Sequence, residues 1–247
     1  MTVSYEMLDE MKAKLDSFRP LLLAVVNNLH EDLVLRWTYN SNAIEGNTLT
    51  LKETKVALEG ITVGGKTLRE HFEVINHREA IGYVEALVSA GGYLSQWHIK
   101  SIHQLILKNI DDENAGSYRK VNVVISGAQH VPPDSFSVAD EMGRFVDWCA
   151  TGAQQLHPVE RAAMVHADFV KIHPFVDGNG RTARLLMNLE LMKSGFPAVV
   201  LPIEKRLEYY EALDRAHVSD DYCPFLQLMI DTVAQGFEPY WRALGLD

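Results

Sequence analysis

Apolar residues recur every three or four positions along almost the whole of this 247-residue chain. Since an α-helix has 3.6 residues per turn, this spacing gives each segment one apolar face to bury. The pattern predicts helices over residues 38–48, from 51 onward, 68–88, 95–107, 138–148, 158–172, 181–193, 204–216 and 223–244, and two more within 5–36, separated near Pro20. We therefore expect an all-α protein, built as a bundle of helices.

Two capping signals and a pair of glycines divide this pattern. Thr50 and Glu53 have the spacing of a capping box, in which each side chain accepts a hydrogen bond from the other residue's main-chain N–H. A helix should therefore begin directly after Thr50. Ser95 has the side chain of an N-cap for the helix that follows it. The glycines at 91 and 92 mark a boundary between an N-terminal helical region and the rest.

One short region departs from helical spacing. Residues 121–126 are rich in β-branched side chains, and a second short run ends at Pro132 and Pro133, which lack the main-chain N–H that a strand needs. We expect the two runs to pair as a small β-hairpin around Gly127.

Charge and composition argue against several functional classes. The chain carries 23 basic and 33 acidic residues, a formal net charge of −10, which disfavours sequence-independent binding to nucleic acid. Its two cysteines are too few for a disulfide framework. It has no apolar run of membrane-spanning length, and its first residues lack the basic and apolar regions of a signal peptide. We expect a soluble, cytoplasmic protein with neither nucleic acid nor membrane as a partner.

Residues 173–184, HPFVDGNGRTAR, place a histidine, a carboxylate, two glycines and two arginines between two apolar helical segments. Main-chain N–H groups at the start of a helix lack partners within the helix and attract anions. The glycines let those groups turn inward and let a ligand approach the backbone. Arg181 and Arg184 lie one helical turn apart and can both face phosphates. This segment therefore predicts a polyphosphate site.

The same residues resemble the full signature of the Fic (Fido) family, His-x-Phe-x-(Asp/Glu)-Gly-Asn-Gly-Arg-x-x-Arg. The likeness also includes 157–169 and the expected hairpin, and it covers roughly residues 95–232. It implies a Fic-type helical bundle with a β-hairpin flap, an N-terminal helical extension over 1–94 and a C-terminal helical end over 233–247. It further implies transfer of AMP from ATP to a Ser, Thr or Tyr hydroxyl of a protein, with loss of pyrophosphate.

The chemistry of the individual residues agrees with this reaction. An imidazole with an ordinary pKa of about 6.5 can accept a hydroxyl proton at neutral pH, which suits His173 as the general base. Asp177 supplies the hard oxygen that Mg²⁺ prefers. The phosphate-binding residues implied by the signature are Gly178, Asn179, Gly180, Arg181 and Arg184.

A second motif lies far upstream. Ser41, Glu45 and Gly46 resemble the inhibitory motif (Ser/Thr)-x-x-x-Glu-(Gly/Asn), here N-terminal to the signature, as in class II members of the family. A glutamate beside Arg184 could form a bidentate ion pair where the γ-phosphate should bind. ATP would then bind with its phosphates misplaced for attack. We therefore hypothesise that Glu45 inhibits the enzyme through Arg184.

Two further groups follow from the resemblance. Val123, Val124, Ile125 and Ser126 resemble the flap that holds the target segment by strand addition and covers the nucleotide, although an incidental surface hairpin is the alternative. Tyr209 and Tyr210 resemble the helix on the adenosine side, where an aromatic ring could stack on adenine; both could equally be core residues.

Other functions stay open at this point. Glu45 could align a water molecule, so that removal of AMP from a protein dominates. The site could also transfer another group, such as phosphate or phosphocholine. A non-catalytic helical interaction protein is the rival from another class, and the intact signature argues against it. The expected ligands are ATP, Mg²⁺ and a target protein, which could be the chain itself, and a homodimer is compatible with the sequence.

Overall fold

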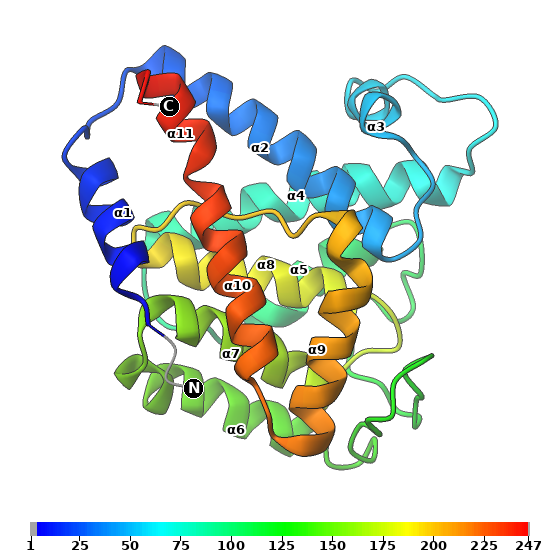
Figure 1. The fold of residues 1–247 in the computed structure, drawn as a ribbon. Helices are drawn as coiled ribbons and strands as arrows, with labels where there is room; N and C mark the ends of the chain where they lie inside the picture. Colours follow the sequence, from blue (N-terminus) through cyan, green and yellow to red (C-terminus); the bar gives the residue numbers. More distant parts are fainter. Residues whose placement is uncertain (1–3, 247) are drawn as a thin grey trace.

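The computed structural model describes residues 4–246, which form a bundle of helices (Figure 1). The helices are α1 (Glu6–Asp16), α2 (Leu23–Ile44), α3 (Leu51–Leu58), α4 (Leu68–Ala90), α5 (Gln96–Leu107), α6 (Val138–Ala150), α7 (Pro158–Ile172), α8 (Asn179–Lys193), α9 (Arg206–Ser219), α10 (Cys223–Gly236) and α11 (Glu238–Leu244), with short 3₁₀ helices η1 (Gly152–Gln155) and η2 (Ile203–Lys205). None of residues 4–246 lies in a strand, so the all-α prediction is confirmed. Among the same residues, no helix has the length and apolarity needed to cross a membrane.

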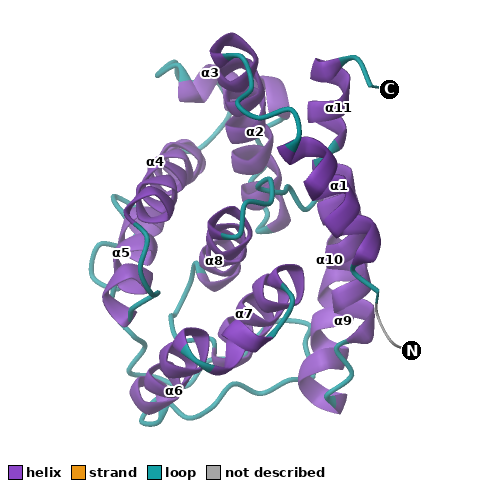
Figure 2. Ribbon diagram, turned by 90° about the vertical axis from the view of Figure 1, so that its left-hand side faces the viewer, coloured by secondary structure: helices purple, strands orange, loops and turns teal. Residues whose placement is uncertain are grey.

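Helix α8 lies in the middle of the bundle. Figure 2 shows it with α4 and α5 on one side and α9 and α10 on the other. It packs along α7 and also against α4 and α5, and most of its residues are buried, including Arg181 and Arg184. The segment that joins α7 to α8 therefore begins the most enclosed helix of the protein.

Two apolar clusters hold the α7 and α8 pair from opposite sides. One brings side chains of α1 and α10, such as Leu8 and Phe225, against Leu191 of α8. The other brings side chains of α4 and α5, such as Ile81, against Leu186 of α8. Complete burial of an aliphatic or aromatic side chain of this size contributes about 1.5–3 kcal/mol to the free energy of folding. The two helices that flank the signature loop are therefore fixed by packing on both faces.

The capping signals are confirmed. Thr50 and Glu53 form the expected capping box, and α3 begins at Leu51. Ser95 caps α5, where the ring of His98 takes the place of the usual acidic partner.

The separate helix expected over residues 38–48 is wrong. Helix α2 continues without a break to Ile44, and Glu45 is its C-cap. The polar side chains of Thr38, Ser41 and Asn42 are all buried in this helix. Asn42 Nδ2 donates to the Thr38 carbonyl (2.8 Å), and the Ser41 hydroxyl accepts from Arg184 Nε (3.0 Å). Glu45, the glutamate of the inhibitory motif, thus lies at the end of a 22-residue helix.

The β-hairpin is also wrong. Residues 121–133 form an irregular loop that contains one turn, in which the Ala128 N–H donates to the Ile125 carbonyl (3.1 Å). Side chains replace the expected ladder of main-chain hydrogen bonds: Asn122 Nδ2 donates to Asp134 (2.9 Å), and its Oδ1 accepts from the Ser135 N–H (2.8 Å). The β-branched composition therefore did not determine the local structure here.

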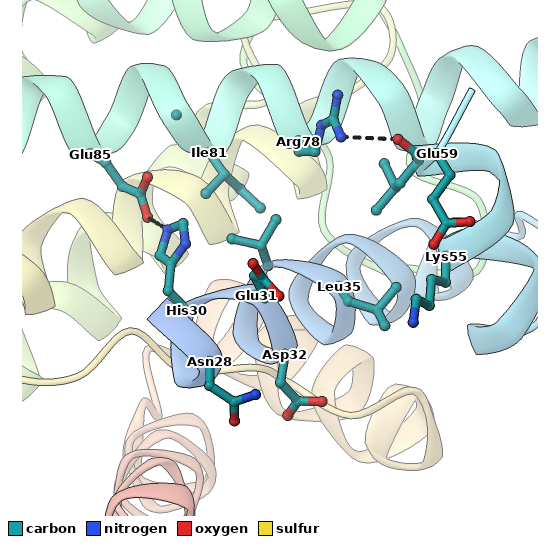
Figure 3. Close-up of a pocket in the computed structure, with 13 residues that line it drawn as sticks. Asn28, His30, Glu31, Asp32, Leu35, Lys55, Glu59, Arg78, Ile81 and Glu85 are labelled. Carbon is teal, nitrogen blue, oxygen red and sulfur yellow. Dashed lines mark hydrogen bonds and ion pairs between the residues drawn. The ribbon is translucent and has the colours of Figure 1, made fainter. Parts of the chain in front are cut away.

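A groove of about 620 Å³ opens between α2, α3 and α4 (Figure 3). Its walls include Leu35 and Ile81, and a contact between His30 and Glu85 (2.7 Å) closes one end. No lining residue of this groove belongs to the 173–184 loop. Because the chemically distinctive residues gather at that loop, we place the candidate functional site there.

Candidate functional site

Two left-handed residues shape the signature loop. His173 is the C-cap of α7 with φ 51°, and Gly178 is the N-cap of α8 with φ 76°. Glycine adopts this conformation freely, but a non-glycine residue does so uncommonly. The backbone of His173 therefore needs support from its surroundings.

Asn179 holds the loop closed on itself. Its amide accepts from the Phe175 N–H (3.0 Å) and donates to the Phe175 carbonyl (2.9 Å). The ring of Phe175 is completely buried and stacks on His103 at 3.5 Å between centroids. The Asn179 side chain is thus used within the loop, and its part in binding an anion stays a prediction.

His103 was not singled out from the sequence, yet it supports the same loop. Its Nδ1 accepts from the Gly116 N–H (3.0 Å), so Nε2 carries the proton and donates to the Asp177 carbonyl (2.8 Å). Burial lowers the pKa of His103 to about 4, against the opposing effect of that carbonyl. Its partner is 74 residues away in the sequence, and no local motif indicates the contact.

The Asp177 carboxylate binds positively charged side chains from two helices. Its Oδ1 accepts from the Gly178 N–H (2.6 Å) and from Arg181 (3.4 Å), and its Oδ2 accepts from Arg69 of α4 (2.7 Å). Burial would raise the pKa of Asp177, but these three partners outweigh it and hold the pKa below its usual range. Glu73 lies between the two arginines, 3.1 Å from Arg69 and 3.8 Å from Arg181. Neither Arg69 nor Glu73 was predicted from the sequence.

Arg184 and Glu45 meet as expected. Arg184 Nη2 donates to Glu45 Oε1 (2.7 Å), although the side chain of Arg184 is only 3% exposed. The contact uses one carboxylate oxygen, so the expected bidentate geometry is wrong. The reason is Ser41, whose hydroxyl accepts from Arg184 Nε (3.0 Å) and whose carbonyl accepts from Nη2 (2.8 Å). Burial would lower the pKa of Arg184, but Glu45 and Tyr209 raise it, and the guanidinium stays charged.

Gly180 makes room for this contact. A Cβ added at Gly180 would collide with the Glu45 carboxylate and would lie 3.2 Å from Arg184 Nη1. The sequence predicted that this glycine lets a ligand approach the backbone. In the structure the group that approaches its backbone is the internal carboxylate.

The two tyrosines differ in their surroundings. Tyr209 is 2% exposed, and its hydroxyl lies 3.0 Å from His166 Nε2 and 3.4 Å from Arg184 Nη1. It is a core residue, and its ring is not open for stacking in this conformation. Tyr210 is 38% exposed, and its hydroxyl donates to the Ile44 carbonyl at the end of α2 (3.1 Å).

The loop that replaces the hairpin runs beside the end of α7. Val124 and Ser126 are exposed, whereas Val123 and Ile125 are half-buried. The side chain of His130 reaches the Lys171 carbonyl (2.8 Å), and the N–H of His130 donates to Asp214 of α9 (2.9 Å). His130, which follows the predicted flap residues, therefore lies against the end of α7, and the flap residues themselves form no strand.

The imidazole of His173 is neutral at pH 7. Burial and, to a smaller extent, the charge of Arg119 lower its pKa to about 4, although the Val170 carbonyl and the Glu45 carboxylate oppose this shift. A neutral imidazole can accept a proton, so the group is in the form that a general base requires.

Five histidines whose pKa is lowered by burial make the stability of the fold sensitive to acid. Burial lowers the pKa of His77, His103, His166, His173 and His217. Because each folded pKa lies below the unfolded value of about 6.5, the unfolded state binds more protons, and stability present above pH 6.5 is lost as the pH falls toward 4.

We expect the free energy of unfolding to fall between pH 7 and pH 5 by about 2 kcal/mol for each of His103, His173 and His217, whose pKa is about 4. Urea unfolding at the two pH values measures this change. His103→Asn should remove about one proton from the pH slope. A free energy of unfolding that is constant over this range would contradict the burial of these rings.

The chain is also similar in sequence to known proteins. The family model described as Fic/DOC family matches residues 93–191. Protein adenylyltransferase Fic of Nematostella vectensis is 38% identical over 240 residues, which are 94% of this chain and 56% of that protein. The protein of the same name from Drosophila mojavensis is 35% identical over 251 residues, 98% of this chain and 49% of that protein. This chain thus spans about half the length of the curated relatives it matches.

Similarity in structure extends over nearly the whole chain. The solved structure of Fic-1 (aa134–508) from C. elegans superposes with a TM-score of 0.88 at 33% identity, covering 97% of this chain and 72% of that one. The signature loop between α7 and α8, the family match and the similarity in structure agree, and the chain belongs to the Fic/DOC family.

Proposed function

We propose that this chain is a protein adenylyltransferase, which transfers AMP from ATP to a hydroxyl group of a protein and is held inactive by Glu45. The observation that carries the proposal is the position of Arg184, a buried guanidinium in the first turns of α8 whose charge is met by a carboxylate from another helix. A fork of N–H donors beside the start of a helix suits a phosphate group.

The rest of the loop fits the chemistry of AMP transfer. Arg181 lies one turn before Arg184, and the unpaired N–H groups of α8 begin at the same end. The target hydroxyl oxygen would attack the α-phosphorus, and the bond from that phosphorus to the bridging oxygen would break and release pyrophosphate. His173 would accept the hydroxyl proton. Such a reaction depends mainly on placement and on neutralising charge, both of which this loop can provide.

Asp177 fits a magnesium ion that arrives with the nucleotide. Within residues 4–246 no group of three or more His, Cys, Asp or Glu residues could hold a metal alone. Mg²⁺, however, is commonly held by one or two carboxylates and the phosphates of its substrate. The Asp177 side chain is 45% exposed, and its Oδ2 already accepts from a cation, Arg69. When bound, Mg²⁺ would neutralise phosphate charge.

Asp177→Asn should remove the effect of magnesium on nucleotide binding. In the Glu45→Gly background we expect the affinity for ATP to become independent of Mg²⁺ and AMP transfer to fall about 100-fold, the loss typical of a displaced phosphate. Calorimetric titration of ATP with and without Mg²⁺ measures the first effect. Asp140, an exposed acid in the first turn of α6, provides the matched control, Asp140→Asn. Unchanged magnesium dependence in Asp177→Asn would rule out this ligand.

Glu45 would inhibit by taking the place of the γ-phosphate. Its carboxylate contacts Arg184 and fills the space over Gly180, so an anion already occupies the place beside this arginine. ATP that bound in this state would place its α-phosphorus out of line with the hydroxyl. Release of Glu45 from Arg184 would therefore be required for transfer.

Mass spectrometry after incubation with ATP, Mg²⁺ and cell lysate tests the activity. The Glu45→Gly protein should produce an adduct with the mass of AMP on a Ser, Thr or Tyr side chain, on itself or on another protein. The same protein carrying His173→Ala should not. An adduct with the mass of phosphate would instead identify a kinase, and no adduct with intact ATP binding would favour a non-catalytic protein.

Removal of AMP from a protein is the second candidate. The hydrogen bond between Glu45 and Arg184 uses Oε1, and the Glu45 side chain is 33% exposed, which leaves Oε2 in place to orient a water molecule. A purified AMP-modified target that loses AMP with the wild-type chain, and keeps it with Glu45→Gly, would support this direction.

A further inference from the structure

Arg119 lies between the base and the irregular loop, and its side chain is buried. The residue is 3% exposed, and burial lowers its pKa from the ordinary value for arginine. Among the described residues its guanidinium takes part in no ion pair with a carboxylate, and Asp134 acts on its charge only at longer range. A buried cation needs other oxygen partners, which here are main-chain carbonyl groups.

These carbonyl groups come from three parts of the chain. Nε donates to the carbonyl of His173 (2.8 Å), Nη1 donates to Val121 (3.1 Å), and Nη2 donates to Pro133. The main-chain N–H of Arg119 donates to the carbonyl of Pro174 (2.9 Å). One residue thus binds both peptide groups that follow the base and both ends of the 121–133 loop.

The carbonyl groups of His173 and Pro174 belong to a stretch of backbone whose conformation needs support from its surroundings. His173 has a left-handed φ of 51°, a conformation that persists in non-glycine residues only where the surroundings fix it. The hydrogen bonds from Arg119 to the His173 and Pro174 carbonyls supply two such constraints. The tip of the 121–133 loop is held separately, by Asp214, which accepts from the N–H groups of Gln129 and His130.

We propose that Arg119 is a positioning residue that fixes the backbone of His173 and the two ends of the 121–133 loop as one unit, so that the base keeps a fixed position relative to this loop. This inference rests on the proposed function. It adds a residue that touches neither the nucleotide-binding arginines nor Glu45, but sets the geometry between the base and the loop beside it.

The matched experiment compares Arg119→Met and Arg119→Lys in the Glu45→Gly protein. Arg119→Met removes the charge and all side-chain donors, and Arg119→Lys keeps the charge but not the fork. The first control is Arg161→Met, which removes another largely buried arginine, paired with Glu190 (3.1 Å) between α7 and α8. The second is Asp214→Asn, which loosens only the tip of the loop.

We expect kcat for AMP transfer to fall about 100-fold in Arg119→Met, the cost typical of a misplaced reacting group, and partial recovery in Arg119→Lys. The Kd for ATP should change less than about twofold, since Arg119 is remote from Arg181 and Arg184 in the hydrogen-bond network. Cleavage of the 121–133 loop by a protease should become faster in Arg119→Met, while Asp214→Asn should show faster cleavage without the loss of kcat.

The pKa of His173, measured by NMR on the protein without ligand, gives a reading that does not depend on activity. The charged groups near this imidazole are Arg119, His130 and Glu45. Removal of the Arg119 charge should raise the pKa of His173 and move the acid limb of the pH profile upward, whereas Arg161→Met should leave both unchanged.

Equal losses of kcat in Arg119→Met and Arg161→Met, with no change in loop cleavage or in the pKa of His173, would overturn the proposal. Failure of the proposed function is a different result: the Glu45→Gly parent would then transfer no AMP, while loop cleavage and the pKa of His173 would still respond to Arg119→Met.

Discussion

Glu45→Gly should raise the rate of AMP transfer about 100-fold over the wild-type chain. A part-buried, charge-assisted contact of the kind between Glu45 and Arg184 amounts to about 3 kcal/mol at most, and each 1.4 kcal/mol corresponds to a factor of ten. Removing the carboxylate frees one of the two donors of Arg184 Nη2, the other being bound to the Ser41 carbonyl, and opens the space over Gly180. The rate of incorporation of labelled AMP, measured at saturating ATP and Mg²⁺, provides the test.

The chain contains a close structural control for this substitution. Glu59 is the C-cap of α3 with φ −80° and precedes a left-handed Gly60, just as Glu45 is the C-cap of α2 with φ −85° and precedes a left-handed Gly46. Glu59→Gly therefore makes the same change at the end of a helix remote from Arg184. A similar gain in both variants, or no gain in Glu45→Gly with ATP binding intact, would refute inhibition by Glu45.

His173→Ala, introduced into the Glu45→Gly protein, should reduce AMP transfer by about 100-fold to 10,000-fold, the range typical for removal of a general base. Because the pKa of His173 is about 4, the base is neutral over most of the accessible range. The rate in the parent protein should therefore stay constant from pH 7 down to about 5 and decline near pH 4, instead of near 6.5.

Rates measured against pH for both proteins, with ATP affinity determined in parallel, separate the loss of the base from the loss of the substrate. His157 serves as the control, since its ring caps α7 by accepting from the Val159 N–H and lies outside the loop. Activity that survives His173→Ala, or an acid limb centred near pH 6.5 in the parent, would show that another group takes the proton.

The helices and the signature loop were predictable because their signals are local. Apolar spacing depends on residues three and four apart, and the caps at Thr50 and Ser95 each join residues three apart. The contact between Glu45 and Arg184 joins residues 139 apart and was expected only through resemblance to a family motif. Its single-oxygen geometry was not predictable, because it depends on Ser41, which takes two of the donors.

The wrong predictions, a separate helix over 38–48 and a β-hairpin, also arose from contacts between parts of the chain that are distant in sequence. Thr38, Ser41 and Asn42 are residues that favour turns when exposed, but here they are buried within α2, where Asn42 Nδ2 donates to the Thr38 carbonyl and Ser41 binds Arg184. The β-branched residues of 121–126 favour strands. Here, however, the guanidinium of Arg119 binds the Val121 carbonyl and the amide of Asn122 binds the Ser135 N–H, in place of a partner strand. Arg119 was missed for this reason as well, since its partners lie up to 55 residues away and are backbone atoms without a sequence signature.

The burial of Arg184 in the central helix links the catalytic state of the protein to its folding equilibrium. Removing one partner of a buried ion pair typically costs 3–5 kcal/mol, because a charge is left uncompensated. In the wild-type chain Glu45 supplies the opposite charge, so the protein without nucleotide keeps its full stability. In the released state the phosphates of ATP would replace that charge, and the melting temperature would depend on nucleotide concentration. Under the proposed function, the resting form would be a fold that carries its own anion, whereas the active form would depend on its substrate to complete its interior.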